Sequence, residues 1–164
     1  MARIYLGVGS NIQPVRNLRL AITELRRRFD NLETSTVYRN APVGFEGQDF
    51  LNLVVRATTD LPPVDVLRAL DDIHDLAGRQ RISVGLTARE LDIDLLLYDQ
   101  VQVDTDDLQL PRSDVLDYDF VLRPLAELAP DYVHPITGKR LDLHWQQFPG
   151  SVRLLQRECI DFDA

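Results

Sequence analysis

The segment Leu91 to Tyr98, with the sequence LDIDLLLY, constrains the fold more than any other part of the chain. Its length and apolar content predict a strand. Alternate residues of a strand share a face, so Ile93 and Leu95 should anchor one face in the core. Asp92 and Asp94 would then project together from the other face, although aspartate is disfavoured in strands. The sequence therefore predicts a sheet with a pair of carboxylates on one face.

Two ionised carboxylates at these positions would lie roughly 6–7 Å apart, where they repel each other and lose water. A hard divalent cation between them reverses that cost. Magnesium suits the pair because it accepts one or two carboxylates, keeps several waters and takes its other ligands from substrate phosphates. Two magnesium ions sharing Asp92 and Asp94 would suit a phosphoryl-type transfer. From this segment alone, two solvated acids at a sheet end are an equally good interpretation.

Arginines bracket the segment that leads into these aspartates. Arg79 and Arg81 follow an expected helix end at Gly78, and Arg89 precedes the strand. In a chain with a net charge of −8 they form a local positive island, which can neutralise a triphosphate and the charge that develops as it breaks. The residues between them lack an apolar period and could close over a nucleotide. The alternative is an exposed loop whose arginines pair with nearby acids.

A second group of residues could hold a flat heterocycle. A loop with one proline and two glycines, residues 40–47, precedes Phe50 and Asn52, which occupy alternate positions of one expected strand. A ring could stack on Phe50 while the Asn52 amide, which both donates and accepts, recognises its edge. Phe120 could supply the other face. On this evidence alone, a core phenylalanine and a strand-capping asparagine are the simpler interpretation.

Strand and helix patterns alternate irregularly along the rest of the chain. No repeat, linker or low-complexity tract divides it, so residues 1–164 are predicted to form one domain. The predicted fold is an α+β, ferredoxin-like sandwich in which helices pack on a mostly antiparallel sheet. Besides 91–98, strands are expected over 3–8, 33–39, 50–58 and, in short pieces, 101–110, and helices over 18–29, 62–77, 120–128 and 151–158.

Charge and composition argue against several other classes of protein. The net charge of −8 disfavours nucleic acid as a partner, and no apolar run approaches the roughly 18 residues of a membrane span. Cys159 is the only cysteine, so no internal disulfide is expected and the cytoplasm is the expected location. The only lysine, Lys139, is not in a P-loop pattern, and the spacing of cysteine and histidine does not fit zinc. A monomer is the default expectation.

The motifs, taken in order, resemble those of 6-hydroxymethyl-7,8-dihydropterin pyrophosphokinases over nearly the whole chain. The Arg-x-x-Asp-x-Asp block with its upstream Gly-Arg-x-Arg is the specific part, whereas Gly-Ser-Asn alone is weak. Leu122 to Pro130 resembles the C-terminal part of that family. The matching motifs are Gly9-Ser10-Asn11, Tyr38-x-x-x-Pro42-x-Gly44, Phe50-Leu51-Asn52, Gly78-Arg79-x-Arg81 and Arg89-x-Leu91-Asp92-Ile93-Asp94.

This resemblance implies an enzyme of folate synthesis that uses magnesium and ATP to place a diphosphate on the hydroxymethyl group of a reduced pterin, releasing AMP. Its partners would be these small molecules. It implies Asp92 and Asp94 as ligands of two magnesium ions, Arg79 and Arg89 as catalytic residues, and in-line attack of the pterin hydroxyl on the β-phosphorus. The nucleotide would contact Arg79, Arg81, Arg89, Leu95, Arg112 and Ser113, and the pterin would contact Asn40, Val43, Phe50, Asn52 and Phe120.

Several positions depart from the family pattern, mostly where the nucleotide should bind. His74 stands where glutamate is usual, Leu86 replaces a tryptophan, Arg112 replaces a histidine and Tyr118 replaces a basic residue. Three hypotheses follow: an active pyrophosphokinase, a divergent paralogue that binds a pterin but has lost or altered its ATP chemistry, and a non-catalytic assembly domain. The third leaves the spacing of the arginines and aspartates as a coincidence.

Overall fold

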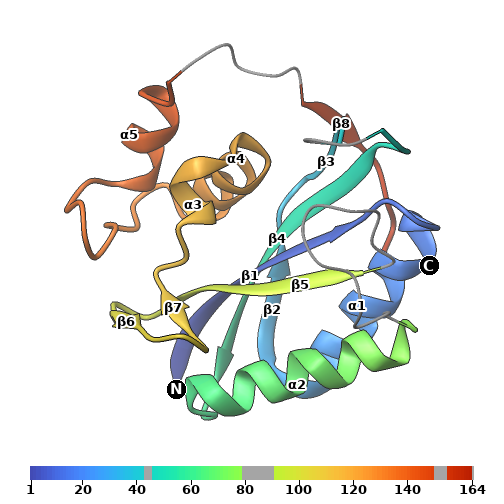
Figure 1. Ribbon diagram of the computed structural model, residues 1–164, viewed down its shortest axis with the longest axis horizontal. Helices are drawn as coiled ribbons and strands as arrows, with labels where there is room; N and C mark the ends of the chain where they lie inside the picture. Colours follow the sequence, from blue (N-terminus) through green and yellow to red (C-terminus); the bar gives the residue numbers. More distant parts are fainter. Residues whose placement is uncertain (43–45, 79–90, 150–154, 164) are drawn as a thin grey trace.

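The main sheet is antiparallel and is built on the long strands β1 (Ala2–Ser10) and β4 (Phe50–Thr59). The computed structural model describes residues 1–164 except 43–45, 79–90, 150–154 and 164 (Figure 1). The other strands of this sheet are β2 (Asp30–Thr34), β3 (Val37–Asn40), β5 (Asp92–Tyr98) and β8 (Gln156–Glu158). In the described part of the chain the order is β5-β1-β4-β3-β8, with β2 also pairing with β4.

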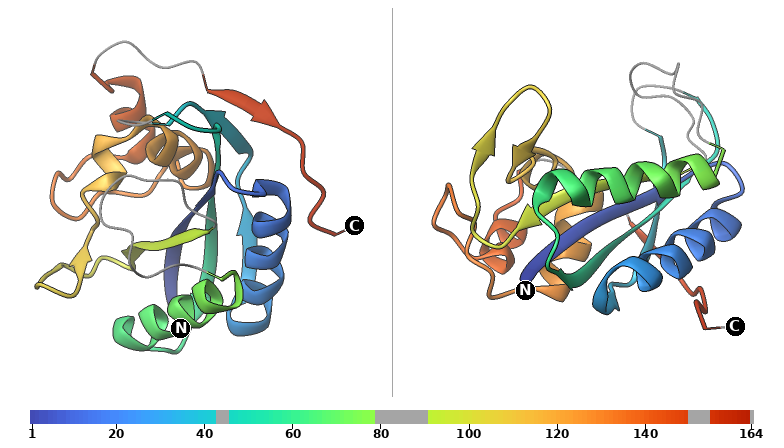
Figure 2. Two further views of the ribbon diagram at one scale, coloured as in Figure 1. Left: turned by 45° about the vertical axis from the view of Figure 1, so that its right-hand side comes forward. Right: turned by 90° about the horizontal axis from the view of Figure 1, so that it is seen from below.

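Two long helices cover one face of this sheet, α1 (Pro14–Arg28) and α2 (Pro63–Leu76) (Figure 2). Each begins at a proline, whose missing N–H is no loss in a first helical turn. Each also carries an apolar stripe with helical spacing, which packs on the inward residues of the strands. This core contains Leu18, Ile22 and Leu25 of α1, Val66, Leu70 and Ile73 of α2, and Ile4, Leu6, Val8, Leu53 and Val55 of the sheet.

Shorter helices cover part of the opposite face. α3 (Asp114–Asp117) leads into α4 (Asp119–Leu128), which packs on β4 and β3, and α5 (Leu141–Gln146) packs on α4. The small hairpin of β6 (Val103–Asp104) and β7 (Gln109–Leu110) connects β5 to this layer. The second core contains Tyr5, Val54, Leu96, Leu122, Leu125 and Leu141. No helix in the described ranges is long and apolar enough to cross a membrane.

The predicted α+β sandwich, with a mostly antiparallel sheet and helices packed on it, is confirmed. The strand expected over 3–8 is longer, because Gly9 and Ser10 continue β1. The single strand expected over 33–39 is two strands, β2 and β3. Between them Ser35 accepts a hydrogen bond from the Val54 N–H through its hydroxyl at 2.9 Å, so the side chain takes the place of a regular ladder partner.

The helix predicted over 151–158 is wrong for Gln156–Glu158. Residues 151–154 lie outside the described residues, and Gln156–Glu158 form the edge strand β8, paired with β3. An ion pair between Arg39 Nε and Glu158 Oε1, 2.5 Å apart, accompanies this pairing. The short helix α5 was not predicted. Both differences arise from contacts between segments that are far apart in the sequence.

Candidate active site

One row of residues runs across the sheet on the side where α4 packs. Gly9 of β1 is paired with Asp92 of β5 on one side and with Asn52 of β4 on the other, and Asn52 is paired in turn with Tyr38 of β3. Directly opposed residues project to the same face of a sheet. The Asp92 carboxylate and the Asn52 amide therefore flank a single glycine. Their Cα atoms are separated by two strand spacings, or about 10 Å across the sheet.

Two glycines of β1 lie in this region, and they are covered to different extents: Gly9 is buried and Gly7 is half-buried. A Cβ atom on Gly9 would lie 2.4 Å from Asn52 Oδ1, so the amide occupies the space that a side chain would need. Gly7, which is paired with Asp94, has more room, because its nearest neighbour would be Leu96 Cδ1 at 3.4 Å. Glycine inside a strand costs stability and commonly marks close approach of a ligand or another group. The glycine floor of β1, formed by Gly7 and Gly9, thus leaves room for the Asn52 amide beside the carboxylates.

His74 of α2 anchors the segment that carries the carboxylates. The backbone N–H of Ile93 donates a hydrogen bond to His74 Nε2 at 2.8 Å, and the histidine is 5% exposed. A ring nitrogen that accepts a hydrogen bond carries no proton, so this contact selects the neutral tautomer with its hydrogen on Nδ1, 3.7 Å from Asp71 Oδ1. Because Ile93 separates Asp92 from Asp94, His74 ties the carboxylate pair to α2.

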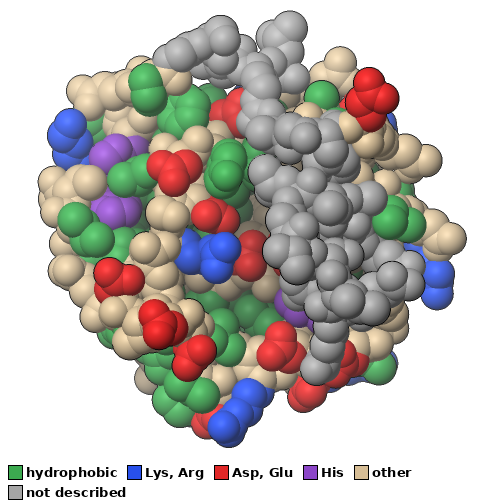
Figure 3. Space-filling model, viewed as in Figure 1, with side chains coloured by type: hydrophobic (Ala, Val, Ile, Leu, Met, Phe, Trp, Pro, Cys, Tyr) green, Lys and Arg blue, Asp and Glu red, His purple; other side chains and the backbone are tan. Residues whose placement is uncertain are grey.

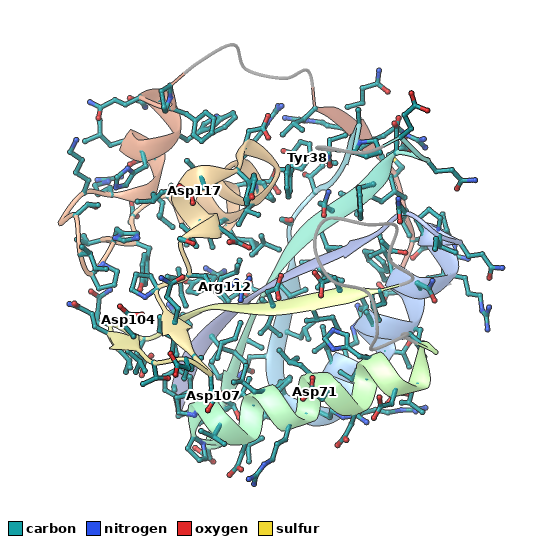
Figure 4. The ribbon with its side chains drawn as sticks, viewed as in Figure 1. Tyr38, Asp71, Asp104, Asp107, Arg112 and Asp117 are labelled. Carbon is teal, nitrogen blue, oxygen red and sulfur yellow. The ribbon has the colours of Figure 1, made fainter. Side chains whose placement is uncertain are left out.

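Arg112 brings a positive charge to the same carboxylates (Figure 4). Its backbone N–H donates to the Leu96 carbonyl at 3.0 Å, near the register shift between β1 and β5. Its guanidinium lies 3.9 Å from Asp94 Oδ1 and 3.2 Å from Asp114 Oδ2. Burial lowers the pKa of Arg112, but Asp94, Asp114 and Asp92 outweigh burial and the net pKa shift is upward. Acidic and basic side chains accordingly lie together near the centre of this face (Figure 3).

A cavity of about 380 Å³ opens beside β5, between α2 and the β6–β7 hairpin. Leu67, Leu70 and Leu95 give it apolar walls, while Asp94 and Arg112 line one part of it. Asp71, Asp106 and Asp107 also line it and add negative charge toward the hairpin. An anionic group is therefore favoured near Arg112 and repelled from the hairpin, whereas an uncharged ring fits against the leucines.

Two asparagines fix the polar side of the site beyond Gly9. Asn52 Nδ2 donates to Asn40 Oδ1 at 2.5 Å, and Asn40 Nδ2 donates to the Ala41 carbonyl at 3.1 Å, so each amide orients the other. Asn40 is paired with Phe50 across β3 and β4, which places Phe50 on the same face, two positions before Asn52. The structure thus brings together Asn40, Phe50 and Asn52.

Phe120 lies in the first turn of α4, the helix that packs on β3 and β4. Its ring stacks on Tyr118, with centroids 5.0 Å apart and an interplanar angle of 23°. The Asp119 carboxylate, on a residue that is 2% exposed, accepts the Phe120 backbone N–H at 2.8 Å and so holds the start of the helix. Tyr118 therefore extends an aromatic surface at the position where the resembled family has a basic residue.

The chemistry of Asp92 and Asp94 fits magnesium bound together with a phosphorylated ligand. Both side chains are partly exposed, and their oxygens are hard donors on one strand face. In the described part of the chain no third carboxylate, histidine or cysteine completes a metal-binding group with them. Magnesium takes one or two protein carboxylates and completes its shell with water and phosphate, whereas structural zinc needs about four protein ligands. The two carboxylates therefore suit a metal that arrives with phosphate.

Of the remaining predicted residues, Leu95 and Ser113 are described by the structure and the others are not. Leu95 is 2% exposed and lines the cavity. Ser113 is exposed, and its backbone N–H donates to Gln109 Oε1 at 3.1 Å. The residues that lie outside the described part are Val43, Arg79, Arg81, Leu86 and Arg89.

Sequence reasoning missed two features of the site. It treated His74 only as a departure from a family pattern, although the residue binds the β5 backbone. The second feature is the pair of glycines at alternate positions of β1, Gly7 and Gly9. Glycine at alternate positions of a strand was the available signal, because both then face the same side.

Comparison with known proteins adds a family model and close relatives. The model described as 7,8-dihydro-6-hydroxymethylpterin-pyrophosphokinase (HPPK) matches residues 5–130. The chain is 38% identical over 144 residues to an Aquifex aeolicus protein named 2-amino-4-hydroxy-6-hydroxymethyldihydropteridine pyrophosphokinase, and the match covers 86% of this chain and 89% of that protein. It is 33% identical over 146 residues to the Dictyostelium discoideum folic acid synthesis protein FOL1, of which it spans 22%.

Solved structures agree on the fold. The wild-type HPPK-DHPS of Plasmodium falciparum, determined with SDX-DHP, superposes with a TM-score of 0.71 and 13% sequence identity. The match covers 90% of this chain and 44% of that chain. At this identity the likeness supports the sandwich architecture alone.

Proposed function

The chain belongs to the 7,8-dihydro-6-hydroxymethylpterin-pyrophosphokinase family and transfers diphosphate from ATP to 6-hydroxymethyl-7,8-dihydropterin in folate synthesis, and we propose that this reaction takes place along the row Asp92–Gly9–Asn52. The observation that carries the proposal is the row itself, which places a carboxylate and an oriented amide on one face, on either side of Gly9. The relatives give no support to a pterin-binding paralogue without ATP chemistry, or to an assembly domain, over this activity.

The pterin is proposed to bind at the asparagine end of the row. Phe50 and Phe120 are the aromatic surfaces on which its ring system would stack, and Val43 would contribute an apolar contact. Asn52 and Asn40 would recognise the pterin edge through their amides, which the 2.5 Å hydrogen bond between them holds in place. This arrangement would direct the hydroxymethyl group across Gly9 toward the carboxylates.

Asp92 and Asp94 are proposed to hold magnesium, with two ions sharing the pair. The metal would neutralise charge on the phosphates and polarise the phosphoryl group. His74 would keep the carboxylates in position through the Ile93 N–H. This tie matters because magnesium demands near-ideal geometry and small displacements of its ligands weaken its binding.

ATP is the co-substrate, and we propose that its nucleoside occupies the cavity beside β5. The apolar walls at Leu70 and Leu95 suit the base, while the acidic hairpin repels the phosphates toward Arg112. Arg112 would contact the phosphate chain together with Arg79, Arg81 and Arg89. Ser113, next to Arg112, would add a polar contact. This orientation would bring the β-phosphate near Asp94.

The proposed reaction is an in-line displacement. The hydroxyl oxygen of the pterin forms a bond to the β-phosphorus and loses its proton, while the bond from that phosphorus to the α–β bridging oxygen breaks. AMP leaves with the bridging oxygen, and the β- and γ-phosphates remain on the pterin. The site contributes mainly by holding the reactants in line and neutralising charge, with Arg79 and Arg89 assigned to the charge that develops.

Product analysis tests this function. The purified chain is incubated with magnesium, ATP and 6-hydroxymethyl-7,8-dihydropterin, and nucleotides and pterins are separated by chromatography. AMP and diphosphorylated pterin should appear in equal amounts, and neither should form without the pterin. ADP as the nucleotide product would contradict diphosphate transfer, and pterin binding without any AMP would favour the paralogue hypothesis. Cytoplasmic location and a monomeric state stay predictions.

A further inference from the structure

The guanidinium of Arg112 occupies a position near Asp94 where its positive charge would repel a cation bound by the two carboxylates. Its Nη1 atom lies 3.9 Å from Asp94 Oδ1, at ion-pair distance but beyond a hydrogen bond. On the other side, Nε and Nη2 donate to Asp114 Oδ2 at 3.4 and 3.2 Å. The guanidinium is thus tethered by Asp114 and leans toward Asp94.

A divalent cation would have to share this small space with the guanidinium. Magnesium bound by Asp94 would lie about 2.0–2.1 Å from the carboxylate oxygen. It would therefore come within a few ångströms of Arg112, and the two positive charges would repel each other. Phosphate reverses the effect, because its oxygens can accept hydrogen bonds from a guanidinium while they also coordinate the metal.

We propose that Arg112 makes metal binding depend on the nucleotide. It weakens the binding of a free divalent cation at Asp92 and Asp94, and it strengthens the binding of the same cation when the cation carries the phosphates of ATP. The inference rests on the proposed function, which assigns metal to these carboxylates. An arginine keeps its positive charge at neutral pH, so the repulsion acts on any free cation at the pair.

Mn²⁺ binding, measured by electron paramagnetic resonance without nucleotide, tests the first half of the proposal. Arg112→Gln should bind Mn²⁺ on the order of tenfold more tightly than the parent chain, because a nearby positive charge is removed. Arg112→Lys, which keeps the charge, should stay closer to the parent. Asp114→Asn should have the opposite effect to Arg112→Gln, since loss of the tether lets the guanidinium move onto Asp94 and weakens Mn²⁺ binding.

The second half is tested with α,β-methylene-ATP and Mg²⁺, because this analogue lacks the bond that breaks in the reaction. Titration calorimetry should show that Arg112→Gln binds the magnesium complex on the order of tenfold more weakly. Unchanged or weaker Mn²⁺ binding by Arg112→Gln would overturn the proposal. If that variant does not fold, as judged by circular dichroism, stronger Mn²⁺ binding by Asp114→Asn would overturn it instead.

Asp94→Asn separates failure of this inference from failure of the proposed function. The variant should lose Mn²⁺ binding if the carboxylate pair holds the metal. If Asp94→Asn binds Mn²⁺ like the parent chain, the metal assignment itself is wrong. If Asp94→Asn loses binding but Arg112→Gln gains none, the metal assignment stands and only the role of Arg112 is refuted.

Discussion

Replacing Gly9 by alanine tests whether the glycine floor of β1 shapes the site. The new Cβ would lie 2.4 Å from Asn52 Oδ1, a contact that real Cβ atoms essentially never make, so Asn52 must shift by roughly half an ångström or more. Overpacking of this kind costs about 1–3 kcal/mol. Loss of the Asn52–Asn40 hydrogen bond adds about 0.5–1.5 kcal/mol, and the lower chain entropy of alanine recovers about 0.5–1 kcal/mol. The net loss of unfolding free energy should be about 1–3 kcal/mol.

Gly7→Ala is the matched control, because Gly7 lies on the same face of the same strand. Its added Cβ would meet the flexible Leu96 side chain at 3.4 Å, an ordinary contact, so stability should stay level or rise by about 0.5–1 kcal/mol. Urea unfolding followed by Trp145 fluorescence measures both variants. Pterin affinity should fall on the order of tenfold in Gly9→Ala, because the asparagine pair is displaced. Equal stability and equal pterin affinity in the two variants would refute the reasoning.

Three further predictions follow from side chains around the site and the second core. His74→Ala should lower the unfolding free energy by about 2–4 kcal/mol, since it leaves a β5 N–H without its acceptor and opens a cavity, and His74→Gln should restore part of this in urea titrations. Tyr38→Phe should lower the unfolding free energy by about 1 kcal/mol, because it removes a 2.7 Å hydrogen bond from the Tyr38 hydroxyl to the exposed Glu127 carboxylate. An unchanged unfolding free energy would show that water replaces this hydrogen bond. Burial lowers the pKa of His134, with His144 adding to the shift, and burial likewise lowers the pKa of His144 from the ordinary 6.5. The unfolded chain then binds protons first, so stability should be full above pH 6.5 and fall as pH drops through it, and His144→Gln should reduce the difference measured between pH 7.5 and 5.5.

Local pattern was sufficient for most of the fold. The alternation in LDIDLLLY gave a strand with its carboxylates on one face, and the two prolines followed by an apolar helical stripe gave α2. These elements were predictable because their side chains repeat with the period of the structure that buries them. The fold class followed from the irregular order of such elements.

The misplaced C-terminal element shows where that reasoning fails. Gln156–Glu158 has no apolar period and forms a strand only because β3 offers it an edge and Arg39 pairs with Glu158. Ser35 similarly interrupts a sequence of strand formers by using its hydroxyl as a ladder partner. Both features depend on partners distant in sequence, which local propensity does not contain.

Within the candidate site, the sequence identified groups that alternate along one strand but not groups joined across elements. Asp92 and Asp94, like Phe50 and Asn52, follow from strand spacing. The contact of His74 with the β5 backbone and the approach of Arg112 to Asp94 require the packing of α2 and the β7–α3 connection against β5. Such contacts became visible only in the folded chain.

The central claim is that the carboxylates on β5 carry the metal-dependent step while the asparagine end binds the pterin. The most direct measurement is the rate of pterin-dependent AMP formation by Asp94→Asn at saturating substrates, together with its pterin affinity and with exposed Asp104→Asn as the control. The account predicts a rate lower by about a hundredfold or more, an unchanged pterin affinity and a normal rate for the control. A rate for Asp94→Asn within a few-fold of the parent chain would contradict it.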